Sequence, residues 1–330
     1  MKVSFPGLVD LQVNGFAGVD FNSPACAGEP IARALAAMRD TGVTRCLPTV
    51  ITSSTEHFAA CAQAILQHPQ VGIAGLHMEG PYISPVDGPR GAHPREHVRP
   101  ASIDDFQRRQ EAAGGRIVLV TLAPEATGAL TLIEYLIQQR IRVAIGHTAA
   151  TARQIADAVQ AGATLSTHLG NGCAGHMHRH ENVLWPQLSA DELTASLIVD
   201  GHHLPREVVR SLVKAKGLAR VVLVTDAVTA AGAPAGRYPL GELEVERDAA
   251  GRVTQVGAGN LAGSALTLDD AIGRTARYCD LSLEQVLPLA STQPAALIGI
   301  QPAGFVEAEW DPVQHRLVVV RVSDDESTRL

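Results

Sequence analysis

The sequence predicts an α/β fold in which eight parallel strands and eight helices form a TIM-like (β/α)8 barrel. Eight short apolar segments typical of strands occur over roughly 220 residues, and a segment typical of a helix follows each of them. Strands that alternate with helices of this length form parallel sheets, and eight such units close into a barrel. A doubly wound open sheet is the alternative. No G-x-G-x-x-G motif follows the first strand, so a dinucleotide-binding fold has little support.

Composition narrows the class of protein. The chain has 330 residues, of which 46% are hydrophobic, enough for one large barrel. A net charge of −7 without a basic tract argues against nucleic acid as a partner. We see neither a signal peptide nor an apolar segment long enough to cross a membrane. Five scattered cysteines form no disulfide framework, which indicates a reducing, cytoplasmic location.

The expected barrel strands share apolar residues and a polar or ionisable residue at or near the end. The third is followed by a long loop rich in Pro, Gly and His, and long loops in compact domains are commonly functional. In order, the strands are expected at 7–14, 43–50, 71–81, 116–125, 141–147, 163–168, 194–203 and 219–227.

The later part of the chain departs from this rhythm. Residues 237–257 alternate with period two around a polar turn, which predicts a β-hairpin. Two helical segments follow, and 305–322 again predicts two strands around a turn, before a frayed end at 323–330. We therefore expect a barrel with a small, reduced β-appendage. The barrel is assigned to 6–236 and 258–300, and the appendage to 237–257 and 301–322.

The segment 144–175 carries the clearest chemical signal. It predicts a strand, a helix and a second strand, and the two strands end in His147 and His168. In parallel α/β folds the active and binding sites lie at the carboxyl ends of the strands, where these two imidazoles would be neighbours. Either histidine alone suggests a hydrogen bond to the backbone, but the pair indicates a metal site.

Other strand ends complete a ring of polar side chains. Glu79 would join the two histidines as a third ligand, leaving the fourth position of a catalytic metal open. Such an ion lowers the pKa of a water toward ~7 and polarises a carbonyl. Asp226 would be the general base, with a helix N-cap as its alternative role. The strand ends considered together are Gln12, Asn14, Glu79, His147, His168, His203 and Asp226.

Three further residues lie outside this list of strand ends, and two of them, Arg179 and His93, have two interpretations each. His77 precedes Glu79 by two residues, and we expect it on the wall side of its strand as a structural hydrogen-bonding group. Arg179, in the histidine-rich tract 176–180, either clamps an anionic group or is an ordinary surface arginine. His93, in the long loop, either reaches the substrate or is solvated.

These residues occur in stretches that resemble a known family, the N-acetylglucosamine-6-phosphate deacetylases of the amidohydrolase superfamily. The matching stretches run in family order across the whole expected barrel, and the candidate ligands match together with their flanks. They are PGLVDLQVNG (6–15), GLHMEGPYIS (75–84), GAHP (91–94), TLAPE (121–125), GHT (146–148), THLGN (167–171), VDGHH (199–203), LVTDA (223–227) and LAGSALTLDDA (261–271).

The resemblance implies a metal-dependent deacetylase of an N-acetylated amino sugar. By resemblance, Asp226 is the catalytic acid and base, and His93 polarises the acetyl carbonyl. The superfamily's H-x-H on strand one is Gln12-Val13-Asn14 here, a vestige of a second metal site, which argues for one ion. The three lysines (Lys2, Lys214, Lys216) cannot supply a bridging ligand. The substrate contacts implied are Ala92, His93, Asn171, Gly172, Arg179, His203, Leu261, Ala262 and Gly263.

A site of two histidines and one carboxylate suits zinc as the first choice of metal, with iron, cobalt or manganese as alternatives. The resemblance also implies a homodimer in which Arg179, eleven residues after His168, contacts the sugar phosphate. The chain departs from the family in a short segment before strand one, a curtailed tail, and HLGNGC in place of H-L-[YF]-N-A-M. The alternatives are therefore an unphosphorylated N-acetyl hexosamine, N-acetylgalactosamine 6-phosphate or another amide as substrate, or a non-catalytic sugar-binding protein.

Overall fold

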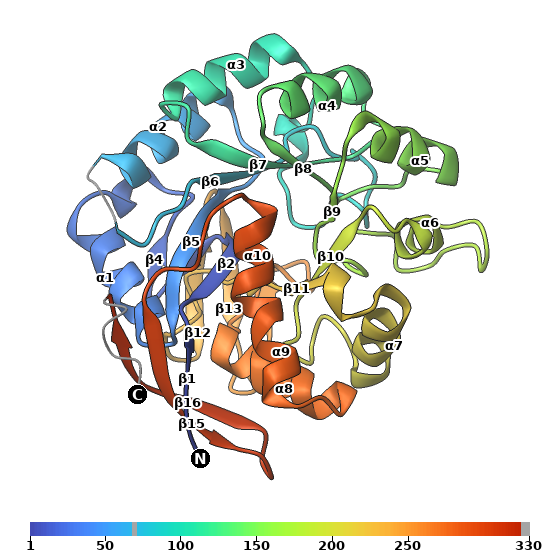
Figure 1. Ribbon diagram of the computed structural model, residues 1–330. Coiled ribbons are helices and arrows are strands. Elements are labelled where there is room, and N and C mark those ends of the chain that lie inside the picture. Colours follow the sequence, from blue (N-terminus) through green and yellow to red (C-terminus); the bar gives the residue numbers. More distant parts are fainter. Residues whose placement is uncertain (68–70, 325–330) are drawn as a thin grey trace.

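The computed structural model describes residues 1–67 and 71–324. Its central feature is an eight-stranded parallel sheet with the strand order β11-β10-β9-β8-β7-β6-β5-β2, which follows the chain. The sheet curls into a barrel (Figure 1). Its strands are β2 (Leu8–Val13), β5 (Val43–Val50), β6 (Leu76–Glu79), β7 (Ile117–Leu122), β8 (Arg142–Ile145), β9 (Leu165–Ser166), β10 (Thr194–Leu197) and β11 (Val221–Leu223).

A helix follows each strand and lies outside the barrel (Figure 1). Helix α5 shows how the sequence sets these boundaries, because Thr151 and Gln154 form a capping box at its start and Gly162, at φ 115°, ends it. The outer helices are α1 (Glu29–Arg39), α2 (Thr55–Leu66), α3 (Ile103–Ala112), α4 (Ala129–Gln138), α5 (Ala152–Ala161), α6 (Leu184–Ser189), α7 (Arg206–Lys216) and α8 (Leu268–Cys279). The predicted barrel is confirmed.

The barrel closes where its first and last strands meet. A parallel bridge joins Val13 to Ala227, and the backbone N–H of Asp226 donates to the carbonyl oxygen of Gln12 at 2.9 Å. The hydroxyl of Thr225 donates to the Asp10 carboxylate at 2.6 Å. We call this junction of β2 and β11 the seam, and it excludes the open-sheet alternative.

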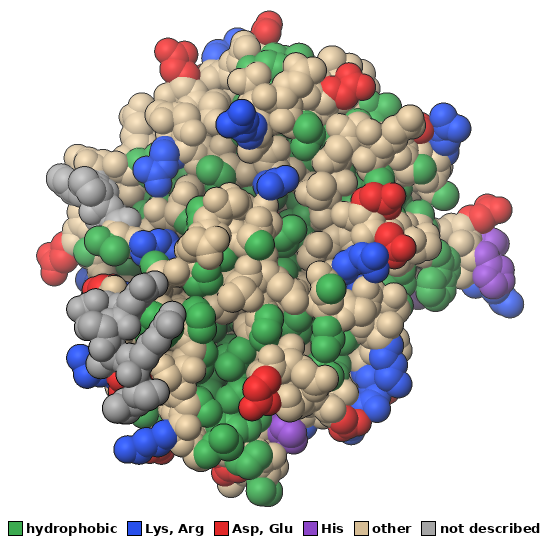
Figure 2. Space-filling view, in the orientation of Figure 1, with side chains coloured by type: hydrophobic (Ala, Val, Ile, Leu, Met, Phe, Trp, Pro, Cys, Tyr) green, Lys and Arg blue, Asp and Glu red, His purple; other side chains and the backbone are tan. Residues whose placement is uncertain are grey.

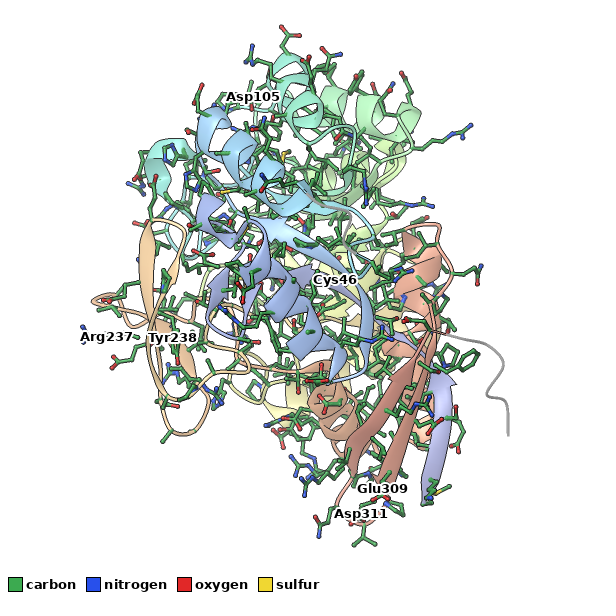
Figure 3. All side chains as sticks on the ribbon, turned by 90° about the vertical axis from the view of Figure 1, so that its left-hand side faces the viewer. Cys46, Asp105, Arg237, Tyr238, Glu309 and Asp311 are labelled. Carbon is green, nitrogen blue, oxygen red and sulfur yellow. The ribbon has the colours of Figure 1, made fainter. Side chains whose placement is uncertain are left out.

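The remaining strands form two separate small sheets. The predicted hairpin at 237–257 lies in a sheet of β12 (Gly236–Leu240), β13 (Leu243–Arg247) and β14 (Val253–Gln255). The predicted tail strands, β15 (Phe305–Asp311) and β16 (Arg316–Ser323), pair with each other. Strand β15 also pairs with β1 (Lys2–Pro6), a strand that is not predicted from the sequence. Figure 3 shows the two sheets on opposite sides of the barrel, with Tyr238 in one and Glu309 in the other.

Two cores match this arrangement. The main core fills the barrel and the layer between barrel and helices. A small second cluster under the β12–β14 sheet includes Val228, Leu240 and Val245, and Ile51 and Ala92 pack against it. Helices α9 (Leu283–Ala290) and α10 (Thr292–Leu297) complete the chain, and the frayed end expected at 323–330 lies mostly outside the described residues. The division into barrel and appendage remains a proposal. No helix in the described ranges could cross a membrane.

Burial of Asp10 at the seam predicts a pH-dependent stability. Burial raises the pKa of its carboxyl to about 7, although hydrogen bonds from Thr225 and Gln12 lower it. Because unfolded aspartate titrates near ~3.9, the folded protein holds this proton more tightly. The stabilisation is therefore complete below about pH 4 and is lost as the pH rises through about 7.

Asp10→Asn should flatten this decline, which amounts to at most about 1.4 kcal/mol per pH unit, because the amide stays neutral. Urea unfolding of wild type and variant at about pH 5 and about pH 8 measures the effect. Asp87→Asn, at an exposed carboxylate, is the control. Parallel pH curves for wild type and Asp10→Asn would contradict the prediction.

Candidate active site

The carboxyl ends of the barrel strands surround a cavity of about 190 Å³. Most of the side chains singled out in the sequence line it, although they come from strands and loops far apart in the chain. The lining residues are Asn14, Ile51, Glu79, Gly88, Gly91, Ala92, His93, His147, His168, Asn171, Gly172, Ile198, His203, Asp226, Leu240, Asn260, Leu261, Ala262 and Gly263. Two of the predicted site residues, Gln12 and Arg179, are not among them.

Glu79, His147 and His168 converge in this cavity. The Nε2 atoms of His147 and His168 lie 3.2 and 3.1 Å from Oε1 of Glu79 and 3.1 Å from each other. All three residues are buried. Burial acts to raise the pKa of Glu79, but its hydrogen bonds with the two histidines hold that pKa well below the usual value, so the carboxylate is charged.

The backbone is strained where these side chains enter the site. His147, His168 and Asp226 have φ values of 50°, 30° and 49°, a region that L-residues rarely adopt. Gly172 lies against both imidazoles. A Cβ on Gly172 would meet Nδ1 of His147 and Cε1 of His168 at 3.1 Å, and its φ of 57° favours glycine. Such strain is typical of functional sites, where surrounding packing holds it in place.

The three side chains fit a divalent metal ion. Nδ1–H of His147 donates to the carbonyl oxygen of Pro89 at 3.0 Å, so Nε2, which faces Glu79 and His168, is the ring nitrogen that a metal ion could bind in place of a proton. Burial acts to lower the pKa of His147, but the negative charge of Glu79 raises it above the usual value. The same negative charge would favour a metal ion in place of the proton. Two imidazoles and one carboxylate are a donor set that zinc and related metals accept.

Gln12 and Asn14 connect the metal-ligand candidates to Asp226. Nε2 of Gln12 donates to Oε1 of Glu79 at 2.9 Å and to Oδ1 of Asp226 at 3.1 Å, and Nδ2 of Asn14 donates to the same Oδ1 at 2.7 Å. Burial and the charge of Glu79 raise the pKa of Asp226 to about 6. An acid with a pKa near neutrality suits both proton acceptance and proton return.

His93 faces the same cavity with a defined tautomer. The hydroxyl and backbone N–H of Thr52 lie 2.8 and 3.4 Å from its Nδ1, which makes Nδ1 an acceptor and leaves the proton on Nε2. Nε2 is 3.9 Å from Oε2 of Glu79. Burial lowers the pKa of His93 well below the usual value. The ring is therefore a neutral donor pointing toward the metal-ligand candidates, as polarisation of a carbonyl requires.

Several residues of the site had not been singled out from the sequence. Ile51, Ile198 and Leu240 line the cavity, while Thr52 and Asp200 bond to its histidines. Apolar residues at strand ends and on a separate sheet carry no local signal of a binding role. Asp200 had a weak signal, since it lies in the stretch VDGHH together with His203.

Arg179 lies away from the cavity, on a projecting segment. We call residues 174–182 the arm; it leaves the body beside α6 (Figures 1 and 2) and carries exposed histidines at its tip. The backbone carbonyl of Arg179 accepts from the indole N–H of Trp185 at 2.8 Å, which helps to shape the arm. Among the described residues that line the cavity, none is arginine or lysine.

His77 lies inside the barrel, and the expectation that it faces the wall was wrong. Side chains on a strand alternate, so His77 and Glu79 share one face of β6. Its Nε2 lies 2.7 Å from the hydroxyl of Thr121, and its Nδ1 lies 3.1 Å from the carbonyl oxygen of Leu11. Burial lowers the pKa of His77 to about 4. The predicted structural role is confirmed.

A second group of ligand atoms occurs outside the cavity. Glu96, His97 and Glu242 offer atoms within 4.8 Å of one another, but Glu96 and Glu242 are exposed. This group joins the loop 81–100 to the turn between β12 and β13, and it serves below as a control.

Comparison with known proteins agrees with this geometry. The family model of the amidohydrolase family matches residues 3–313. The chain belongs to the amidohydrolase family. This confirms the superfamily that the sequence motifs indicated, and its members combine a barrel of this kind with metal-dependent hydrolysis.

Several proteins similar to this chain are named as deacetylases. N-acetylgalactosamine-6-phosphate deacetylase from Escherichia coli O157:H7 is 35% identical over 302 residues, which cover 89% of this chain and 78% of that protein. Human N-acetylglucosamine-6-phosphate deacetylase is 35% identical, with coverages of 91% and 75%. An N-acetyl-D-glucosamine-6-phosphate deacetylase from Mycobacterium smegmatis, solved as an aspartate-to-alanine variant with N-acetyl-D-glucosamine-6-phosphate, superimposes with a TM-score of 0.89 at 29% identity, covering 97% of this chain and 86% of that chain.

Proposed function

We propose that the protein hydrolyses the acetamide of N-acetylglucosamine 6-phosphate, releasing acetate and glucosamine 6-phosphate. The observation that carries this proposal is one cavity in which Glu79, His147 and His168 converge opposite Asp226, with the donor His93 beside them. The similarity to deacetylases over most of the chain supports the choice of an N-acetyl amino sugar.

Each side chain of the site has its own proposed role in amide hydrolysis. Asp226 accepts a proton from the attacking water and returns it to the leaving nitrogen. Nε2–H of His93 donates to the carbonyl oxygen as negative charge develops there. Asn14 and Gln12 hold Oδ1 of Asp226 through their amide N–H groups, so Oδ2 is the oxygen free to exchange the proton. Leu261, Ala262 and Gly263, with Asn171 and Gly172, form the wall against the sugar.

Glu79, His147 and His168 would hold the metal ion. When bound, one divalent ion, zinc as our first choice, would supply positive charge that lowers the pKa of a water and polarises the acetyl carbonyl. Because Gln12 and Asn14 direct amide N–H groups at the carboxylates of Glu79 and Asp226, we propose a single ion. The amide N–H groups give Asp226 partners in place of a second cation.

Acetate release from N-acetylglucosamine 6-phosphate, with metal added or chelated away, tests the function. Turnover that depends on metal supports the proposal. The proposal is overturned if the protein turns over none of the N-acetylated hexosamines, phosphorylated or unphosphorylated. N-acetylgalactosamine 6-phosphate is a second candidate, because a relative with that name matches at 35% identity. The unphosphorylated sugar is a third, because arginine and lysine are absent from the described cavity lining.

Arg179 does not line the cavity of its own chain, and the arm projects from the body (Figure 2), which favours contact with a sugar phosphate bound in another copy of the chain. We therefore propose a homodimer in which the arm of each copy approaches the cavity of the other. The apolar groove of about 1210 Å³ beside the arm, lined by Met177, Val183 and Trp185 among others, offers a surface for this contact.

All five cysteines are free, which supports our proposal that the protein is found in the cytoplasm.

Arg179→Ala should raise KM for N-acetylglucosamine 6-phosphate by about 10- to 100-fold, the usual cost of a lost charge-assisted hydrogen bond. The KM for unphosphorylated N-acetylglucosamine should not change. Steady-state kinetics on both sugars measure the difference, and Arg237→Ala, an exposed arginine on β12 (Figure 3), is the control. An equal effect on both sugars would remove the phosphate role.

A further inference from the structure

His203 presents one ring nitrogen to the cavity and the other to a buried carboxylate. Its Nδ1 lies 2.7 Å from Oδ2 of Asp200, and the two side chains are only 6% and 8% exposed. The ring lines the cavity. Within residues 1–67 and 71–324, no protein group bonds to the other nitrogen, Nε2, which leaves this atom for a ligand.

Asp200 is held so that it can only accept hydrogen bonds. Its Oδ1 accepts from the backbone N–H groups of His202 and His203, both at 2.8 Å, and Arg274 donates to its backbone carbonyl at 3.1 Å. Burial acts to raise the pKa of Asp200, but the His203 ring and the two N–H groups hold it below the usual value. Because the ionised carboxylate has no proton to give, Nδ1 of His203 must carry the proton.

We propose that Asp200 is a positioning residue that fixes His203 with its proton on Nδ1, so that Nε2 accepts a hydrogen bond from a hydroxyl group of the sugar. This inference rests on the proposed function. Asp200 does not itself line the cavity and acts on the substrate only through the imidazole of His203.

The chemistry of Nε2 selects the group that it binds. A lone pair backed by a carboxylate repels an anionic phosphate oxygen and attracts a neutral donor. The amide N–H of the acetamide must face Asp226, which returns a proton to that nitrogen, so a ring hydroxyl remains. His93 is the complement, because Thr52 makes its Nε2 a donor. The cavity therefore holds one histidine that donates, for the carbonyl, and one that accepts, for the sugar.

Asp200→Asn should reverse the polarity of His203. The asparagine oxygen must still accept from the two backbone N–H groups, so its NH2 group faces Nδ1 and moves the ring proton to Nε2. We expect the melting temperature and metal content to stay as in wild type. The kcat/KM should fall by about 10- to 100-fold, mainly through KM. ¹⁵N NMR of histidine-labelled protein should show the change of tautomer at His203.

Two comparisons separate positioning from a general structural effect. His202→Gln changes the neighbouring histidine, which bonds to the carbonyl of Ala250 outside the cavity, and should leave KM unchanged. Asp200→Asn combined with His203→Gln should cost no more than His203→Gln alone, because both act through one ring. Should the Asp200→Asn protein not fold, the tautomer of wild-type His203 and the KM of His203→Gln decide the matter.

A wild-type His203 with its proton on Nε2, an unchanged KM in Asp200→Asn, or additive losses in the double variant would overturn the inference. Failure of the proposed function looks different. In that case the wild-type protein releases no acetate from any N-acetylated hexosamine, while the NMR signal of His203 still reports whether Asp200 sets its tautomer.

Discussion

Asp226→Asn is expected to retain the metal ion and to lose about 10²- to 10⁴-fold in kcat for acetate release, the range of general acid–base catalysis. Gln12 and Asn14 both donate to Oδ1 of Asp226, so the asparagine oxygen takes that place. Its NH2 group then occupies the position of Oδ2, where it can neither accept the proton of the water nor return one to the amine. Turnover under saturating substrate, with metal analysis of the same sample, measures both parts.

Asp269→Asn is a matched control for this change. Burial also raises the pKa of Asp269 to about 6, but this residue does not line the cavity, so its substitution should leave kcat unchanged. If Asp226→Asn turns over at the wild-type rate, Asp226 is not the acid–base group. If it loses metal together with activity, its role is to hold the site.

Glu79→Gln is expected to lose the tightly bound ion and to lower kcat by about 10³-fold or more, since a metal contributes several kcal/mol to charge stabilisation. The glutamate is the single negative charge among the three candidate ligands. A neutral amide leaves His147 and His168 to hold a dication alone. Metal content after dialysis against chelator, followed by activity with and without added zinc, tests this prediction.

The group of Glu96, His97 and Glu242, whose two glutamates are exposed, provides the control. Glu96→Gln should change neither the ion retained after dialysis nor kcat, because this group lies outside the cavity. A Glu79→Gln protein that keeps one ion and full activity, or a Glu96→Gln protein that loses both, would show that the catalytic ion binds elsewhere.

The sequence was sufficient for the barrel and for its ring of strand-end side chains. Short apolar segments that alternate regularly with helical segments predict the strands, and parallel strands bring their carboxyl ends to one side of the sheet. That rule alone places His147, His168 and Asp226 near one another without knowledge of any contact. By the same rule the polar ends of 7–14 and 71–81 belong to the same mouth.

Other features depend on contacts that local patterns do not encode. Thr52 hydrogen-bonds to Nδ1 of His93 through its hydroxyl and its backbone N–H, and Asp200 hydrogen-bonds to Nδ1 of His203. Threonine and aspartate are common in proteins without any such role. The pairing of β1 with β15 joins opposite ends of the chain. A five-residue segment such as β1 is too short for its sequence pattern to show with which other strand it pairs. The position of Arg179 depends on the path of the arm. The amino-acid composition of a segment can identify it as a loop, but it does not predict the direction in which the loop leaves the barrel.

The seam has a consequence for how activity returns during refolding. The bond from Gln12 to Asp226 joins residues 214 positions apart, and contacts of such long range form late because chain entropy opposes them. The Asp226 carboxylate receives both of its amide donors, Gln12 and Asn14, from the end of the first barrel strand, whereas Asp226 itself follows the last barrel strand. A chain with its helices and most strands formed but its barrel still open therefore lacks an organised Asp226, the proposed acid–base group. During refolding, enzymatic activity should thus recover at the rate of barrel closure and not at the faster rate of secondary-structure formation. The recovery of acetate release would then report the rate of the final folding step.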